Sequence, residues 1–284
     1  MGQAMTLSSG PVVLVTGCSS GIGLACAVAL AGAGHQVIAT VRGPGRGDRL
    51  RAAAGQAGAV LDVRLLDVTD EESVQRCVAG LIAEYGRLDS VLNNAGAGHV
   101  GTTEQDSLED LRRVMEVNFF GVARVTRAAM PHLRASRGRL VTVTSVGGVV
   151  GQPFNEAYCA AKFAVEGLME GLAPVARRMG VRVSVVEPGA VASEFVANAG
   201  QVQERLAAAG PYRKLLQGYL ERTRGAFAAA QAPEQVAAVV LGVPTAAEPA
   251  FRYQTSESAS QFVGLKLADR TGATVQHLTG GWLG

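Results

Sequence analysis

Cysteine is scarce in this sequence, and the spacing patterns that would give it a structural role are missing. The four cysteines among 284 residues, Cys18, Cys26, Cys77 and Cys159, lie far apart, with no CxxC pair and no cluster with histidine. Disulfide frameworks and zinc sites both need closely and regularly spaced ligands. We therefore expect reduced thiols, no disulfide-stapled fold and no bound metal.

An excess of charge of either sign is also absent. The 26 basic and 24 acidic side chains leave a formal net charge of +2, and neither sign gathers into a block along the chain. Proteins that bind nucleic acids or membrane surfaces through electrostatics carry a concentrated basic patch. We therefore expect no nucleic-acid partner.

Long hydrophobic runs are missing, although 48% of the residues are hydrophobic. Each apolar run is interrupted well before the roughly 20 residues that a bilayer span requires, so no membrane span is expected. Residues 1–11 lack the basic segment and long apolar stretch of a secretory signal. These absences favour a soluble globular protein of cytoplasmic location, with enough chain to bury a sizeable core.

What the sequence does contain is an alternation of short β-branched segments with longer segments rich in alanine and leucine. This alternation predicts a doubly wound α/β fold of the Rossmann type, a parallel sheet with helices on both faces. The expected strands are 12–16, 36–41, 63–66, 90–93, 139–144, 181–186 and 251–254. The expected helices are 22–33, a segment near 50, 70–85, 108–135, 157–179 and 233–243.

Residues 194–230 depart from this alternation. They form an apolar insertion that we expect to be helical, and its large side chains include Phe195, Tyr212, Leu216 and Tyr219. We expect the insertion to cover an apolar substrate as a lid, although the same helical spacing also fits side chains that simply complete a core. Neither a linker nor a repeat divides the chain, so a single domain over 1–284 is expected.

A glycine-rich turn follows the first expected strand. Residues 16–23 read TGCSSGIG, and the next helix begins directly after them. Glycines there let the backbone approach a pyrophosphate, which the amides and the positive end of the helix would stabilise. A tight turn required only for packing is the alternative. The candidate cofactor-binding residues of the turn are Gly17, Ser19, Ser20, Gly21, Ile22 and Gly23.

The end of the second expected strand indicates which dinucleotide binds. An acidic residue there would accept hydrogen bonds from the adenine ribose, but the sequence has Thr40, Val41 and Arg42 instead. The planar guanidinium of Arg42 suits a 2′-phosphate, so we expect NADP(H) rather than NAD(H). The alternative is that Arg42 is an ordinary solvated surface arginine.

Three residues further along carry acid–base chemistry. Tyr158 and Lys162 are spaced i and i+4, which places an ammonium beside a phenol on one helix face, and Ser145 ends the preceding strand. Lowering a phenol pKa from ~10 to ~7 requires about 4 kcal/mol of preferential phenolate stabilisation, which Lys162 and an oxidised nicotinamide would supply. Taken singly, Tyr158 could be a surface tyrosine of a helix, Lys162 an extended surface lysine, and Ser145 a strand-end cap.

These motifs, in this order, resemble those of the short-chain dehydrogenases/reductases. The resemblance covers residues 12 to about 195, and within the family it is greatest to the oestradiol-type hydroxysteroid dehydrogenases and the photoreceptor-type retinol dehydrogenases. The motifs that carry it are TGCSSGIG (16–23), Asp67 and Val68, NNAG (93–96), VNFFG with Asn118, Ser145, YxxxK (158–162) and PG (188–189).

The resemblance implies catalytic roles for four residues. Tyr158 would donate or accept the proton, Ser145 would hold the substrate oxygen, and Lys162 would bind the nicotinamide ribose and lower the tyrosine pKa. Asn118 would support a water molecule in the proton relay.

The resemblance also implies a cofactor-binding set beyond the glycine turn. Ser19 and Arg42 would hold the 2′-phosphate, and Tyr158 and Lys162 would contact the cofactor as well. The remaining residues of the set are Asp67 and Val68 at adenine, Asn94, Ala95 and Gly96 at the ribose, and Pro188, Gly189, Val191 and Ser193 near the nicotinamide. Ser193 stands where the family pattern PGxxxT has threonine, so its hydroxyl is retained.

The expected function is that of an NADP(H)-dependent oxidoreductase interconverting a carbonyl and an alcohol. Its substrate would be a hydrophobic ketone or aldehyde, steroid-, retinoid- or polyketide-like, and the helices at 108–135 and 157–179 resemble a family pair that forms homodimers or homotetramers. Two alternatives stay open: a dehydratase or epimerase of the same fold, and a non-catalytic NADP(H)-sensing protein.

Overall fold

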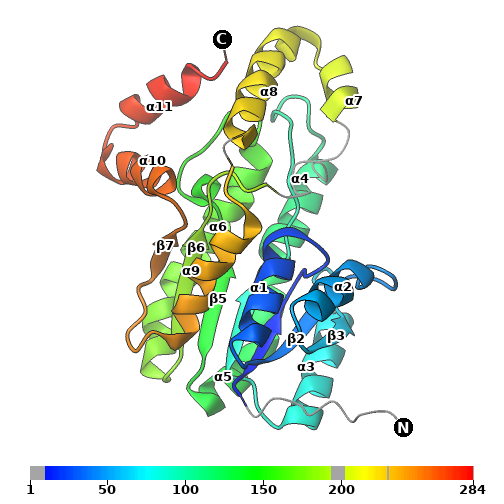
Figure 1. The fold of residues 1–284 in the computed structure, drawn as a ribbon. Coiled ribbons are helices and arrows are strands. Elements are labelled where there is room, and N and C mark those ends of the chain that lie inside the picture. The colour runs from blue at the N-terminus through cyan, green and yellow to red at the C-terminus, as the bar shows by residue number, and fades with distance from the viewer. Residues whose placement is uncertain (1–9, 193–201, 229, 284) are drawn as a thin grey trace.

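Seven strands pair in parallel to form one sheet in a computed structural model that describes residues 10–192, 202–228 and 230–283 (Figure 1). The order across the sheet is β3-β2-β1-β4-β5-β6-β7. The strands are β1 Val12–Val15, β2 Gln36–Val41, β3 Leu61–Leu65, β4 Ser90–Asn93, β5 Arg139–Val143, β6 Arg182–Glu187 and β7 Arg252–Gln254. The expected doubly wound α/β fold is confirmed.

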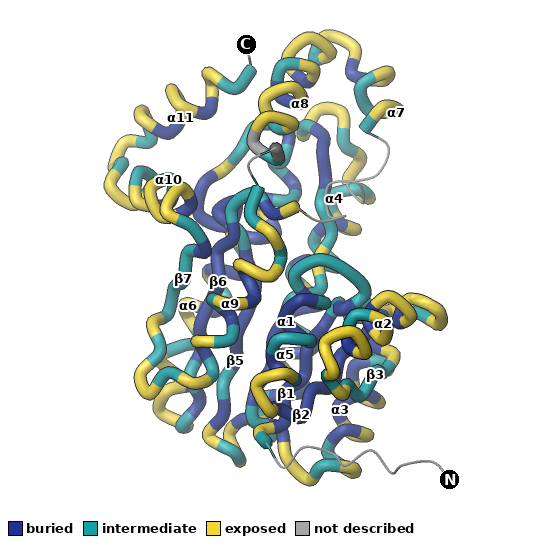
Figure 2. Tube along the Cα trace, viewed as in Figure 1, coloured by how far each residue is buried: buried dark blue, intermediate teal, exposed yellow. Residues whose placement is uncertain are grey.

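Helices cover both faces of the sheet, which explains why the central strands are apolar at almost every position. On one face, α1 Gly21–Gly32 and α9 Pro233–Thr245 pack over Val13 and Val15 of β1. On the other face, Leu14 contributes to the core beneath three helices. These are α3 Glu71–Tyr85, α5 Gly121–Ser136 and α6 Glu156–Arg178, while α2 Asp48–Gln56 lies near β3 and β2. Figure 2 shows β1, β2, β4, β5 and β6 as deeply buried, whereas the edge strands β3 and β7 are half-buried.

The strand order reverses between β1 and β4, which are neighbours in the sheet. The chain moves outward from β1 through β2 to β3, then crosses back so that β4 pairs with the free side of β1. Loops that leave the two carboxyl ends at such a reversal diverge and leave a crevice, the usual ligand position in open α/β sheets. The glycine turn after β1 and the NNAG segment after β4 both lie at this edge.

The helix expected over 108–135 is interrupted. The structure has α4 Leu108–Met115, a π-helical turn η1 Glu116–Phe120, and then α5. The π turn contains Asn118, whose side chain is completely buried and whose Nδ2 donates to the carbonyl oxygens of Ala97 and Val114, both at 3.0 Å. Such insertions redirect one side chain out of the regular helical register and are frequent at functional sites.

Several helices of the C-terminal third lie at the same end of the molecule (Figure 1). The insertion contains α7 Val202–Ala207, the 3₁₀ turn η4 Gly210–Tyr212 and α8 Arg213–Ala228. Two further helices, α10 Glu257–Ala268 and α11 Ala273–Gly280, follow β7 and were not predicted. Both expose much of their surface (Figure 2). In the described parts of the chain, no helix combines the length and apolar character needed to cross a membrane.

Candidate active site

A cavity of about 990 Å³ opens at the crevice between β1 and β4. Most of the candidate residues line it. From the cofactor set these are Gly17, Ser19, Ser20, Gly21, Ile22, Gly23, Arg42, Asp67, Val68, Asn94, Ala95, Gly96, Pro188, Gly189 and Val191, joined by Ser145, Tyr158, Lys162 and Tyr219. Asn118, Tyr212 and Leu216 are not among the described lining residues, and Ser193 and Phe195 lie outside the described part of the chain.

The glycine turn after β1 packs closely against the end of β4. Gly17 has a φ of +73°, and a Cβ there would lie 2.8 Å from the Ala95 Cα. A Cβ at Gly23 would collide with Asn94 Nδ2 and the Gly17 carbonyl oxygen. Both positions therefore exclude larger residues, because the first needs a left-handed backbone and the second has no room. The turn holds the N-terminus of α1 at the cavity, where its free amides favour an anion.

Thr16 and Asn94 join the two strand ends, a role that the sequence did not reveal. The Thr16 Oγ1 accepts hydrogen bonds from the backbone amides of Asn94 at 2.9 Å and Ala95 at 3.0 Å. In return, Asn94 Nδ2 donates to the carbonyl oxygens of Thr16 at 2.9 Å and Gly17 at 3.1 Å. The Asn94 side chain thus fixes the glycine turn itself. The available signal was the threonine that ends the first strand directly before the glycine.

Next to the end of β2, the cavity carries positive charge that could bind a phosphate. Arg42 directly follows β2, and both it and Arg46 are exposed and line the cavity. Asp67 follows β3 and accepts hydrogen bonds from the Thr69 amide at 2.9 Å and hydroxyl at 2.7 Å, which shapes the adjoining loop. A glycine cradle at a helix N-terminus, with cations at the far end, fits a phosphorylated dinucleotide.

Ser145, Tyr158 and Lys162 converge on the same cavity from two elements. Ser145 follows β5, and its Oγ accepts a hydrogen bond from the Gly147 amide at 3.0 Å. Tyr158 and Lys162 lie one turn apart on α6, with the Lys162 Nζ 5.8 Å from the Tyr158 ring centroid. The Nζ also donates to the Val143 carbonyl oxygen at 3.1 Å, which holds the ammonium against the end of β5.

Burial controls the protonation of this group. Burial raises the pKa of the Tyr158 phenol, and a hydrogen bond with Ser145 acts in the opposite direction. Burial lowers the pKa of Lys162 to about 8, and the negative charge of Glu166 partly offsets this. Burial therefore favours the protonated phenol, and the expected lowering of its pKa by Lys162 together with an oxidised nicotinamide stays a prediction. A protonated phenol is the form that a proton donor requires.

Glu166 belongs to this environment but was not a candidate from the sequence. It lies one turn beyond Lys162 on α6, is only 5% exposed, and burial raises the pKa of its carboxyl to about 7. The Arg252 Nε lies 3.5 Å from its carboxylate and 3.2 Å from that of the buried Glu187. The i, i+4 spacing from Lys162 was the signal that could have drawn attention to it.

The candidate lid residues Tyr212, Leu216 and Tyr219 all pack in one small core under α8, but their other contacts differ. Tyr219 lines the cavity, and its hydroxyl accepts a hydrogen bond from Asn155 Nδ2. Leu216 is 1% exposed and packs with Val100 and Phe154 in a separate small core under α8. The Tyr212 hydroxyl donates to the Glu104 carboxylate instead of entering the cavity. Leu216 therefore belongs to the packing of the insertion, the alternative considered for these side chains.

A doubly wound parallel sheet, with a dinucleotide cradle beside a Ser–Tyr–Lys group, defines a class of nicotinamide-dependent oxidoreductases. Residues 11–204, more than half of the chain, match the family model described as short chain dehydrogenase. The chain belongs to the short-chain dehydrogenase family.

Known relatives match nearly the whole chain. It is 39% identical over 277 residues to retinol dehydrogenase 8 of Bos taurus, covering 92% of this chain and 86% of that protein. It is 39% identical over 274 residues to 17-beta-hydroxysteroid dehydrogenase type 1 of Homo sapiens, covering 92% and 82%. The solved structure of a short-chain dehydrogenase from Streptomyces avermitilis superposes with a TM-score of 0.74 at 32% identity, covering 96% and 98%.

Proposed function

We propose that this oxidoreductase uses NADP(H) to interconvert a carbonyl and an alcohol on a hydrophobic molecule. The observation that carries the proposal is the convergence of Ser145, Tyr158 and Lys162 on the cavity that also contains the glycine turn. Residues 1–284 act as a single catalytic domain, and the insertion at 194–230 is the substrate lid.

The chain's own residues supply the proton chemistry. Tyr158 donates its phenolic proton to the carbonyl oxygen as the alcohol forms, and the Ser145 hydroxyl holds that oxygen in place. The Lys162 ammonium stabilises the phenolate that remains. When bound, the reduced nicotinamide supplies the two electrons as a hydride to the carbonyl carbon.

The preference for NADP(H) over NAD(H) rests on the charge at the end of β2. Arg42 and Arg46 lie at the cavity together with Ser19, and a guanidinium forms paired hydrogen bonds with a phosphate. The carboxylate that would accept hydrogen bonds from an adenine ribose is absent from this position of the sequence, since Arg42 directly follows Val41.

A hydrophobic substrate is supported by large side chains that line the cavity. They come from the insertion and from the chain after β7, and they are Tyr219, Phe227, Phe262, Leu278 and Trp282. The names of two relatives, a retinol dehydrogenase and a hydroxysteroid dehydrogenase, agree with this chemistry. We propose a ketone or aldehyde that is steroid-, retinoid- or polyketide-like.

We also propose that the protein acts as a homodimer or homotetramer. The α4, η1 and α6 elements pack against one another and leave Leu108, Phe120 and Phe163 exposed. Large exposed apolar side chains on adjoining helices are typical of surfaces that bind another protein.

The direct test is the Tyr158→Phe variant, assayed with NADPH and a panel of steroid, retinoid and polyketide-like carbonyls. We expect kcat to fall at least ~10²-fold, because the transferable proton is lost while the ring remains. NADPH binding, measured by its fluorescence, should persist. Tyr85→Phe is the matched control, because Tyr85 is not among the described residues of the cavity and its hydroxyl donates to Asp62 at 3.0 Å. Near wild-type turnover by Tyr158→Phe would contradict the assignment.

A further inference from the structure

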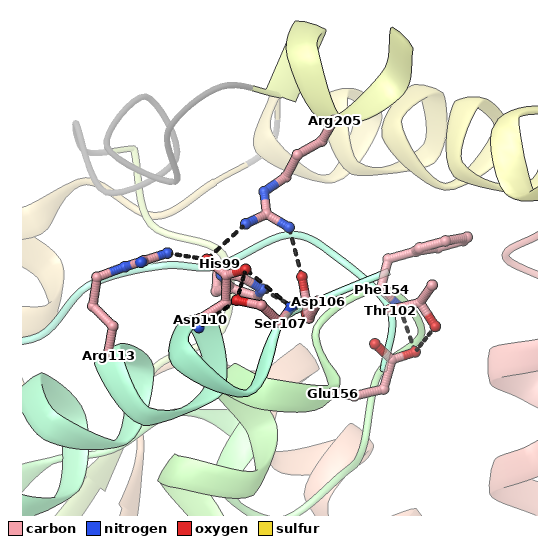
Figure 3. A network of polar contacts seen from close by, with 9 residues as sticks. All are labelled: His99, Thr102, Asp106, Ser107, Asp110, Arg113, Phe154, Glu156 and Arg205. Atoms are coloured by element: carbon pink, nitrogen blue, oxygen red, sulfur yellow. Dashed lines mark hydrogen bonds and ion pairs between the residues drawn. The ribbon is translucent and has the colours of Figure 1, made fainter. Parts of the chain in front are cut away.

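A buried histidine belongs to a network of polar contacts that the proposed reaction does not use (Figure 3). His99 lies in the loop after β4, is 5% exposed and lines the cavity. Its Nε2 lies 2.8 Å from the Asp106 Oδ2, and the Asp106 Oδ1 lies 2.6 Å from the Arg205 Nη1 of α7. Asp106 is only 1% exposed and is not among the described lining residues, so it contacts the histidine from behind the cavity wall.

The local backbone is shaped to admit this network. A Cβ at Gly101 would lie 2.6 Å from the Arg205 Nη1 and would collide with the Asp106 carboxylate. The Gly101 amide donates to the Phe154 carbonyl oxygen at 2.9 Å, which joins the His99 loop to the segment just before α6. His99 is thereby held on the wall of the cavity near the helix that carries Tyr158.

In a neutral His99 ring, the pairing with Asp106 places the proton on Nε2. A carboxylate only accepts hydrogen bonds, so Nε2 must be the donor, and Nδ1 of a neutral ring is then an acceptor. The described residues provide no hydrogen-bond partner for Nδ1. Arg205 neutralises Asp106 and also lies 3.7 Å from Asp110, which is itself paired with Arg113. The nearby Glu156 is engaged by the Thr102 hydroxyl and the Phe154 amide.

We propose that His99 is a specificity-determining residue whose Nδ1 accepts a hydrogen bond from a hydroxyl group of the substrate. Asp106 and Arg205 are positioning residues that hold the ring in the required tautomer. The inference rests on the proposed function and narrows it: the substrate is a hydrophobic carbonyl compound that carries a separate hydroxyl. A buried acceptor left without its partner disfavours an analogue that lacks the hydroxyl.

A set of matched ketones tests the proposal, namely trans-1-decalone and its ring-hydroxylated derivatives, each reduced with NADPH. In the wild type, at least one hydroxylated decalone has a kcat/KM about tenfold above that of the parent ketone. His99→Leu removes this preference, so that kcat/KM for the hydroxylated decalone no longer exceeds that for the parent ketone. Val100→Ala, a neighbouring change in the cavity wall, keeps the preference. A preference that survives His99→Leu, or that no hydroxylated decalone shows, overturns the proposal.

A second measurement separates this proposal from the proposed function. The ¹⁵N signals of the His99 ring are recorded in the protein with NADP⁺ and each decalone, a mixture in which no reduction occurs. The free protein should show the tautomer protonated at Nε2, and the preferred hydroxylated decalone should shift the Nδ1 signal while the parent does not. Asp106→Asn should reduce both the population of the Nε2-protonated tautomer and the shift of the Nδ1 signal. A shift without any turnover on addition of NADPH means that only the proposed function fails, and the absence of a shift overturns the role of His99.

Discussion

Lys162 has an unusual position for a cation. It is 4% exposed, its ammonium is held by the Val143 carbonyl oxygen at 3.1 Å, and burial lowers its pKa to about 8. Glu166, one turn away, counters that effect and is itself costly to bury in its charged form. Burying Glu166 therefore costs folding stability, but its negative charge helps Lys162 to remain largely charged near neutral pH.

Glu166→Gln should make the protein more stable at high pH. Burial raises the pKa of Glu166 from 4.5 to about 7, so the folded state binds more protons between these values and stability falls as pH rises through them. The substitution removes this loss, so we expect the free energy of unfolding to exceed that of the wild type at pH 8 by up to about 3 kcal/mol. The gain fades toward pH 4.5. Denaturant titrations at several pH values measure it, with the exposed Glu170→Gln as control. A gain independent of pH would contradict the explanation.

Arg42→Ala should affect the two nicotinamide cofactors differently. Because a charge-assisted hydrogen bond contributes ~1.5–3 kcal/mol, we expect KM for NADPH to rise about tenfold or more, and KM for NADH to change little. Arg49→Ala is the control, since Arg49 is exposed nearby but is not among the described residues of the cavity. Equal weakening of both cofactors would show that Arg42 does not bind the 2′-phosphate.

At the scale of elements, the insertion has its own small core and its own attachments. Leu216 and Leu220 of α8 pack with Val100 and Phe154, and the α7 residue Arg205 pairs with Asp106 of the loop after β4. The Gln105 side chain also donates to the Ala208 carbonyl oxygen at 3.2 Å. The described helices of the insertion are thus fixed to the loop after β4, and only part of their surface faces the cavity.

Leu216 and Tyr219 share a small core, but only Tyr219 lines the cavity, so their truncations should differ in the effect on substrate binding. Leu216→Ala empties a buried site and should lower the free energy of unfolding by about 2–5 kcal/mol with little change in substrate KM. Tyr219→Ala should also lower stability, because Tyr219 is buried in the same core, but since its side chain lines the cavity it should in addition raise KM for a bulky apolar carbonyl several-fold. Thermal unfolding and steady-state kinetics on both variants measure these effects. A large rise in KM for Leu216→Ala without loss of stability would show that Leu216 contacts the substrate.

Strands and helices could be predicted from the sequence where a local pattern of residue types determines them. The β-branched strands and the glycine turn have local signatures, so the sheet and the position of the cradle could be predicted. The π turn at Asn118 could not, because it depends on contacts between Asn118 and the distant Ala97. The helices α10 and α11 were missed because they follow the last strand, where the alternation of strands and helices gives no further guidance. The Asp106–His99 pair joins residues of one loop, which has no periodicity to indicate which side chains meet.

For the whole molecule, the exposed apolar surface of α4, η1 and α6 is the feature that the fold leaves unexplained. Phe163→Glu places a charge on this surface and should convert the proposed oligomer to monomers, as measured by light scattering after gel filtration. Leu267→Glu is the control, because Leu267 is equally apolar and 66% exposed but lies on α10. If Phe163→Glu has the same mass as an oligomeric wild type, the subunit interface lies elsewhere. If the wild type is a monomer, the proposed oligomer is wrong.

The most direct test of the central claim is the absorbance of the reduced nicotinamide during conversion of a hydrophobic carbonyl. The account predicts that one NADPH is consumed for each alcohol formed by the wild type, and that Tyr158→Phe nearly abolishes both changes. Product formed with no net loss of NADPH would indicate a dehydratase or epimerase of the same fold. If NADPH binds but no carbonyl of the panel oxidises it, the protein would be a cofactor sensor. Either of these two results would contradict the proposed reaction.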